Sequence, residues 1–106
     1  MKGFSIDAQG VARADFDANE AMICWFLEQD IQSSQNVCTE YVTALEAVRS
    51  GQIKKWKSTG NAFTLTAKKF ESIINAEYFD GFLAITTERL IECLKDWSRH
   101  IEKQQT

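Results

Sequence analysis

The segment 54–70, KKWKSTGNAFTLTAKKF, constrains the fold more than any other part of the chain. Its apolar and polar residues alternate on both sides of Gly60-Asn61, a dipeptide of the kind that forms tight hairpin turns. The segment therefore predicts two antiparallel strands joined by a two-residue turn at Gly60-Asn61. In that hairpin, one face carries Trp56, Ser58, Phe63 and Leu65.

The expected register places Ser58 opposite Phe63 and turns Lys55 and Lys57 to the other face. Burying a large side chain such as Phe63 stabilises a fold by roughly 1.5–3 kcal/mol. We therefore interpret the segment as a core hairpin with a solvated basic back. The alternative is a nucleic-acid surface, which would place lysines and aromatic rings on one exposed face. Its residues would be Lys54, Lys55, Lys57, Lys68 and Lys69.

The remaining segments predict further strands and helices on both sides of this hairpin. Strands are expected at 4–6, 11–15, 70–75 and 82–86. Helices are expected at 18–33, at 37–50 and from Thr87 to near the C-terminus. The order ββ-αα-βββ(β)-α predicts an α+β fold, with an antiparallel sheet of about four to six strands packed with three helices.

Local signals mark the ends of these helices. Asp17 and Glu20 have the spacing of a capping box, Thr87 is expected to cap the last helix, and Gly51 suits the left-handed position after the second. The run 22–27, MICWFL, makes the first helix apolar around much of its girth. Such a helix is buried on more than one face or presents a surface to a partner.

The length predicts one domain over residues 1–106, and the odd number of cysteines without a CxxC motif predicts a cytoplasmic protein. The hydrophobic fraction of 44% supports a folded core. No run of about 18 apolar residues suits a membrane span, and no apolar secretory signal opens the chain. The cysteines lie far apart without a CxxC motif, which indicates reduced thiols that act as small buried hydrophobic residues. They are Cys24, Cys38 and Cys93.

The sequence contains few residues that could perform catalysis. His100 is the one histidine, and we expect it to be a solvated cation near a helix C-terminus. No metal-ligand spacing or phosphate-binding loop is present. Helix capping and surface charge explain the paired carboxylates of 15–17 and 28–30 without a general acid. We therefore expect a protein that is not an enzyme and that needs no cofactor or metal.

The charges are unevenly distributed along the chain. Residues 1–46 hold eight acids and two bases, whereas 47–70 hold six bases and no acid. Charge asymmetry of this kind steers the encounter with a partner. The acids expected to form one surface, at the junction of the first hairpin and helix, are Asp15, Asp17, Glu20, Glu28 and Asp30. Each could instead serve only as a cap or for solubility.

Several of these residues occur in an order known from other proteins. They are Gly10-Val11, Trp25-Phe26 with Glu28, and Trp56-x-x-x-Gly60-x-x-Phe63-Thr64-Leu65. In this order they resemble the YacL-like family of small enterobacterial proteins over most of the chain. The chain departs from that family at 66–85, where it is shorter and less acidic. The resemblance implies a fold and carries no activity.

A looser resemblance, in size and charge, is to the immunity proteins of contact-dependent growth inhibition systems. It implies a non-catalytic partner of a cognate toxin domain, often a nuclease, whose basic active site an acidic surface could block. The alternative is nucleic-acid binding through the basic hairpin 54–69, which the acidic pI of about 5.1 disfavours. The basic hairpin could also serve a toxin that is acidic at its interface.

Overall fold

The structure of the chain, a computed structural model, describes residues 4–6, 12–14, 21–78 and 81–105. Its strands are β1 (Phe4–Ile6), β2 (Ala12–Ala14), β3 (Trp56–Thr59), β4 (Phe63–Ala67), β5 (Glu71–Ala76) and β6 (Phe82–Thr86). Its helices are α1 (Ala21–Phe26), the π-helical turn η2 (Leu27–Ile31), α2 (Gln35–Ser50) and α3 (Thr87–Gln105).

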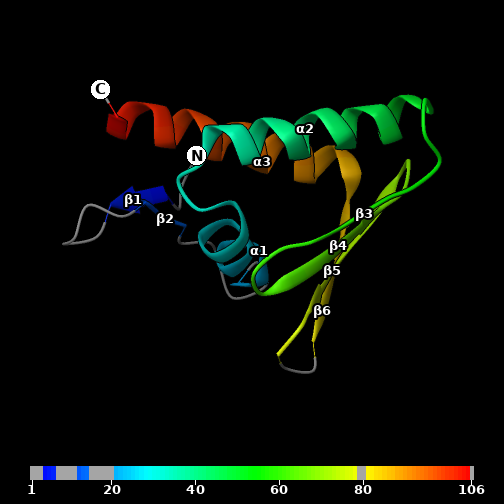
Figure 1. Cartoon of the computed structure of the whole chain (residues 1–106), viewed down its shortest axis with the longest axis horizontal. Coiled ribbons are helices and arrows are strands. Elements are labelled where there is room, and N and C mark those ends of the chain that lie inside the picture. The colour runs from blue at the N-terminus through cyan, green and yellow to red at the C-terminus, as the bar shows by residue number, and fades with distance from the viewer. Residues whose placement is uncertain (1–3, 7–11, 15–20, 79–80, 106) are drawn as a thin grey trace.

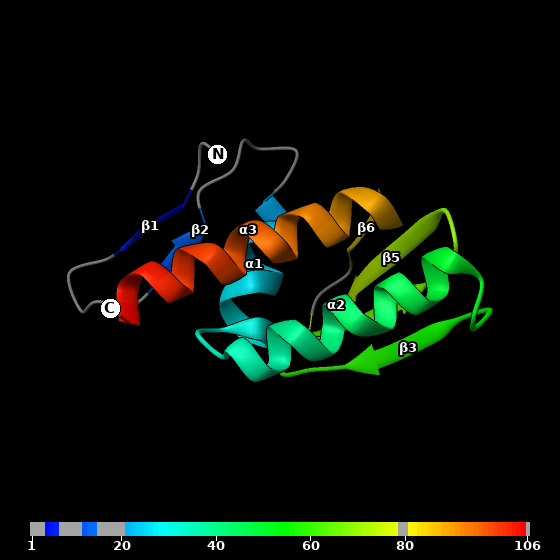
Figure 2. The ribbon, with the colours of Figure 1, turned by 90° about the horizontal axis from the view of Figure 1, so that it is seen from above.

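Strands β3 to β6 form a four-stranded antiparallel sheet in sequential order, and β1 pairs with β2 in a separate antiparallel hairpin. Helices α2 and α3 lie side by side on one face of the sheet, with α1 close to the same face (Figure 1 and Figure 2). No described element covers the opposite face, which we call the open face (Figure 1). The predicted α+β class and antiparallel sheet are confirmed, with four strands in the main sheet.

The hydrophobic core lies between the sheet and the helices. Phe63, Leu65 and Ile74 of the sheet are buried against Leu45 of α2 and Trp97 of α3. These sheet residues lie on one face because side chains alternate along a strand. The predicted burial of the hairpin's apolar face is therefore confirmed.

The turn between β3 and β4 lies one residue later than the dipeptide rule predicts. The N–H of Gly60 donates to the carbonyl of Phe63 at 2.9 Å, so the turn residues are Asn61 and Ala62. Ser58 therefore pairs with Leu65, and the predicted pairing with Phe63 is wrong. A register shift of two residues keeps every side chain on its predicted face, since side chains repeat every second residue.

The first helix differs from the single helix predicted at 18–33. Within the described residues it runs as α1 and then widens into η2, and the N–H of Gln32 donates to the carbonyl of Leu27 at 2.7 Å. Gln32 has a φ of 57°, which few residues other than glycine adopt. Its carbonyl accepts a bond from the Trp97 ring nitrogen Nε1 at 2.7 Å, so a tertiary contact holds this irregular end.

The ends of α2 follow the expected capping chemistry. Ser34 caps its N-terminus by accepting a hydrogen bond from the N–H of Val37 at 3.2 Å. Gly51 follows its C-terminus with a φ of 88°, which confirms the predicted left-handed position. The capping box predicted at 17–20 lies outside the described residues.

Helix α3 begins at Thr87 as expected, but Thr86 caps it. The Oγ1 atom of Thr86 accepts a hydrogen bond from the N–H of Arg89 at 3.1 Å. Thr87 is buried instead, and its hydroxyl donates to the carbonyl of Lys68 and contacts the hydroxyl of Ser72 at 2.8 Å. Thr87 therefore ties α3 to the sheet, and the predicted role as the cap is wrong by one residue.

The three cysteines are buried, as predicted for small hydrophobic residues. None of the helices in the described ranges is long and apolar enough to span a bilayer.

Candidate functional site

The carboxylate of Asp30 joins η2 to the turn between β3 and β4. Its Oδ1 atom accepts a hydrogen bond from the N–H of Ala62 at 2.8 Å, and Oδ2 accepts one from the N–H of Phe63 at 3.1 Å. The side chain of Asn61 also donates to the carbonyl of Gln29 at 2.9 Å. These three bonds hold the turn rigidly against η2.

Gly60 makes room for this carboxylate. A Cβ atom on Gly60 would lie 2.5 Å from Oδ2 of Asp30, closer than real Cβ contacts come. Any other residue at position 60 would therefore push Asp30 away from the turn. Among the described residues Gly51 is the one glycine with a positive φ, so the backbone conformation of Gly60 does not require glycine. Glycine is required at position 60 by the close approach of Asp30.

Burial dominates the electrostatics of Asp30, which is 9% exposed. Loss of solvation raises the pKa of its carboxyl above the ordinary value of 3.8, while the backbone N–H donors of the turn oppose this and the nearby Glu77 adds to it. Asp30 is therefore part of the internal bonding of the fold. Asp30 is therefore not part of a surface for a partner, although the sequence predicted that it would be.

The other acids of the predicted surface are found at different places. Glu28 lies half-buried on η2, two residues from Asp30. Asp15, Asp17 and Glu20 lie outside the described residues. Glu28 is thus the one member of the predicted set that the described structure places at the protein surface.

The structure places three further residues near the β3–β4 turn that the sequence did not single out. The N–H of Glu77 donates to the carbonyl of Ala62 at 2.9 Å, which puts the start of the β5–β6 loop beside the β3–β4 turn. Tyr78 follows with 82% of its surface exposed, and Trp25 on α1 is 48% exposed. We call this region the η2 end, and its residues are Trp25, Glu28, Gln29, Asn61, Ala62, Glu77 and Tyr78.

An apolar hollow of about 420 Å³ lies within the η2 end, lined by Trp25, Gln29, Ala62 and Phe63. Phe63 forms its floor, because that ring is 1% exposed and belongs to the core. The hollow is large enough for an apolar side chain of a partner. One signal in the sequence could have indicated an exposed aromatic side chain near this hollow: Tyr78 stands in an expected loop, where it has no core to fill.

The lysines of the predicted basic face lie on and beside the β3–β4 hairpin. All five lysines, Lys54, Lys55, Lys57, Lys68 and Lys69, are exposed. Two of them, Lys55 and Lys68, line a hollow of about 220 Å³ on the open face together with Thr66, Glu71, Ile73 and Asn75. The Nζ atom of Lys69 lies 5.4 Å from the ring centre of Phe70, which is itself 78% exposed. This face can attract anions, with the carboxylate of Glu71 partly offsetting its charge.

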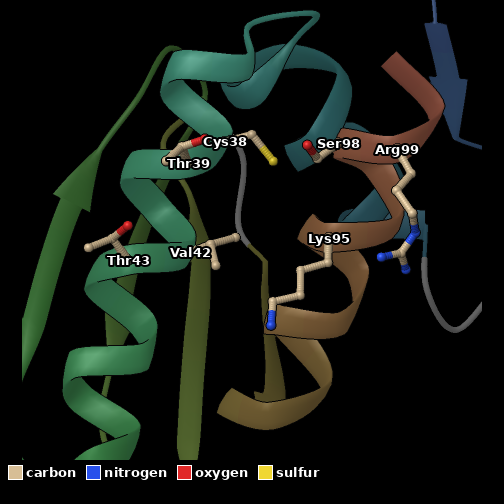
Figure 3. A pocket seen from close by; sticks show the side chains of 7 residues that line it. All are labelled: Cys38, Thr39, Val42, Thr43, Lys95, Ser98 and Arg99. Carbon is tan, nitrogen blue, oxygen red and sulfur yellow. The ribbon is translucent and has the colours of Figure 1, made fainter. Parts of the chain in front are cut away.

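A third hollow, of about 230 Å³, lies in the groove between α2 and α3 (Figure 3). Its residues are Cys38, Thr39, Val42, Thr43, Lys95, Ser98 and Arg99. The Sγ atom of Cys38 donates to the carbonyl of Leu94 at 3.1 Å, and burial raises the pKa of this thiol to about 11. The thiol is protonated near neutral pH, so it is a poor nucleophile.

The cations of this groove are engaged within the protein. Lys95 pairs with Glu46 of α2 at 2.9 Å, and Arg99 pairs with Asp96. The hydroxyl of Ser98 donates to the side-chain oxygen of Gln35 at 2.6 Å. The contacts of Lys95 and Ser98 join the two helices, whereas the pair of Arg99 and Asp96 lies within α3. The groove is therefore part of the packing between α2 and α3.

His100 lies near the end of α3, half-exposed, with its ring 5.7 Å from that of Trp97. Within the ranges that the structure describes, no three His, Cys, Asp or Glu side chains gather in a way that could hold a metal ion. The η2 end and the basic face are therefore the two candidate surfaces.

No model of a known protein family, no curated protein and no solved structure matches the chain. The resemblance to the YacL-like family and to immunity proteins stays a prediction from the residues quoted above.

Proposed function

We propose that the chain is a non-catalytic immunity protein of the cytoplasm. It binds and neutralises the cognate toxin domain of a contact-dependent growth inhibition system, and it does so through the η2 end. The observation that carries this proposal is the apolar hollow that the exposed Trp25 lines, with the exposed Glu77 and Tyr78 in the loop beside the β3–β4 turn and Glu28 on η2.

The chemistry of the η2 end suits a protein partner. Tryptophan and tyrosine are enriched among the interface residues that contribute most to binding, and they act best beside a pocket. The exposed carboxylate of Glu77, which also accepts a hydrogen bond from the hydroxyl of Thr64, would face basic residues, which nucleases use to hold phosphates. Charge complementarity of this kind speeds encounter and excludes wrong partners. A nuclease domain is therefore the toxin that these charges favour.

The η2 end is also preorganised. The two bonds that Asp30 accepts and the bond from Asn61 fix the turn before any partner arrives. A surface that is rigid beforehand loses less entropy when it binds. An interface of the usual size would bury about 1,600 Å² in total, so it would extend beyond the hollow onto η2 and the β5–β6 loop.

The test uses the protein domain encoded directly upstream, produced alone and together with this chain. We expect that domain to be toxic alone and harmless when the two are co-expressed, and we expect the pair to co-purify. Trp25→Ala should weaken binding by about tenfold or more, measured by calorimetry. Phe70→Ala is the matched control, because Phe70 is 78% exposed on a turn that contributes nothing to the η2 end.

Two results would contradict the proposal. The first is an upstream domain that is harmless, or one that stays toxic in the presence of this chain. The second is a complex that Phe70→Ala weakens as much as Trp25→Ala does, since the interface would then lie elsewhere.

A second function is nucleic-acid binding through the basic face. The exposure of all five lysines, from Lys54 to Lys69, favours it. Such binding would weaken steeply with salt, with a log–log slope of about −0.9 for each phosphate contacted on duplex DNA. A gel-shift assay at low salt tests it, and the absence of retardation at micromolar protein removes it.

A further inference from the structure

The outer edge of β3 has unpaired backbone groups. The bond from the N–H of Gly60 to the carbonyl of Phe63 fixes which residues of β3 face β4. Hydrogen-bonded pairs alternate along an antiparallel ladder, so Ser58 and Trp56 also bond inward. The N–H and C=O groups of Lys57 and Thr59 therefore point away from the sheet. Figure 2 shows β3 at the margin of the fold, with no described element beyond it.

This edge is held firmly in place from the helix side. The hydroxyl groups of Tyr41 and Ser58 lie 3.1 Å apart, and the rings of Tyr41 and Trp56 pack edge to face with centres 5.0 Å apart. The edge strand is thus anchored to α2 while its outward backbone groups stay open. An anchored edge of this kind can act as a template for another strand.

The charge of the edge determines which strand can pair with it. Lys54, Lys55 and Lys57 are exposed along it, and residues 47–70 contain no acid. Lysines on an edge oppose pairing with a second copy, since antiparallel pairing of β3 with itself would bring like charges together. A nucleic acid offers phosphates to the lysines, but it cannot complete a ladder with alternating N–H and C=O groups.

We propose that the β3 edge binds an extended acidic segment of another protein, which adds to the sheet as a fifth strand. The segment would pair its backbone with Lys57 and Thr59 and place a carboxylate side chain beside the ammonium group of Lys57. Directly opposed side chains lie about 5 Å apart in such a pair, which is close enough for an ion pair. This edge is separate from the η2 end, so the inference does not depend on the function proposed above.

The first test uses a fluorescein-labelled seven-residue peptide of alternating glutamate and threonine, titrated into the protein at low salt. We expect the anisotropy to rise with this peptide and to stay flat with a peptide that has lysine in place of glutamate. Methylating alternate backbone nitrogens of the glutamate peptide should abolish binding, because it blocks the ladder and leaves the charges unchanged. Equal binding of the methylated peptide would overturn the proposal.

The second test changes the edge itself. Thr59→Pro removes an outward N–H, and proline is tolerated at edge positions of this kind. Thr59→Val is its control, because it keeps the N–H and loses only the 2.9 Å contact with the hydroxyl of Thr64. We expect Thr59→Pro to weaken peptide binding about tenfold and Thr59→Val to change it little. Circular dichroism shows whether both variants are folded.

Charge variants separate strand addition from a diffuse basic surface. Lys57→Glu should abolish binding, while Lys69→Glu, in the turn between β4 and β5, should leave it nearly unchanged. Equal losses in both variants would overturn the proposal. So would an oligonucleotide that binds this face regardless of Thr59→Pro, or a concentration-dependent dimer in sedimentation, since either would make a different partner the occupant.

Discussion

The η2 end and the β3 edge carry opposite charges and use them differently. Next to the η2 end, the carboxylate of Asp30 is buried, and both its oxygens accept backbone hydrogen bonds. At the β3 edge the ammonium groups of Lys55 and Lys57 lie in water. One charge organises the fold, whereas the others remain available to a partner.

This difference shows that acidic charge along a sequence does not by itself indicate which carboxylates reach the surface. Asp30 and Glu28 are two residues apart and look alike in the sequence, yet Asp30 is buried and Glu28 is half-buried. A lysine on a strand keeps its charge exposed because its long side chain can reach water. A short aspartate beside a tight turn can instead be enclosed by the N–H groups that it binds.

The largest effect is expected from Asp30→Ala. We expect it to lower the free energy of unfolding by about 3 kcal/mol, because two N–H groups lose a charged acceptor. Gly60→Ala should lower it by about 2 kcal/mol, since a Cβ atom would meet Oδ2 of Asp30 at 2.5 Å. Urea denaturation measures both.

The double variant sharpens this prediction. With the carboxylate removed, the new methyl group at position 60 has room, so the two losses should fall short of additivity by about 1 kcal/mol or more. Strict additivity would mean that Gly60 serves the turn for a reason unrelated to Asp30.

A smaller effect is expected from pH. The pKa of Asp30 is raised in the fold above its ordinary 3.8, mainly by burial. At pH values between the ordinary pKa and the raised pKa of Asp30, the folded state binds more protons than the unfolded state. The carboxyl of Asp30 therefore adds stability as pH falls through its raised pKa, and this contribution is lost as pH rises. The difference in unfolding free energy between wild type and Asp30→Ala should therefore grow from pH 7 to pH 4.

The other carboxyls cancel in that difference, because both proteins contain them. If this difference in unfolding free energy instead became smaller toward acid pH, the pKa of Asp30 would be lowered in the fold. The two backbone N–H bonds would then outweigh the effect of burial.

The smallest effect is expected at the β3 edge. Lys55→Glu combined with Lys57→Glu should change the free energy of unfolding by less than about 0.5 kcal/mol, because both side chains are solvated. Thermal or urea unfolding measures it. A loss comparable to that of Asp30→Ala would remove the contrast between the two regions and show that the lysines have structural partners.

Much of the fold could be predicted from local patterns. Strand alternation placed Phe63 and Leu65 on the buried face, and a glycine after an amphipathic helix ended α2 at Gly51. The register of β3 and β4 could not be predicted in this way. The position of the turn depends on the hydrogen bonds that Asp30 accepts from Ala62 and Phe63. These residues lie 32 and 33 positions farther along the chain.

The candidate site was predicted less well than the fold. The apolar run 22–27 indicated either burial on more than one face or a surface for a partner, but it did not show that Trp25 would be an exposed residue. Glu77 and Tyr78 join the site only because the β5–β6 loop lies beside the β3–β4 turn. No periodicity along the chain reports that two loops meet at the same end of a sheet.

The sequence by itself determined the class of fold, the faces of the hairpin and the exposure of the lysines, since these follow from the short repeat of side chains along strands and helices. Only the tertiary structure decided the strand register, the burial of Asp30 and the grouping of aromatic and acidic residues at the η2 end. Those features depend on contacts between distant segments, and such contacts form only when the chain has folded around its core.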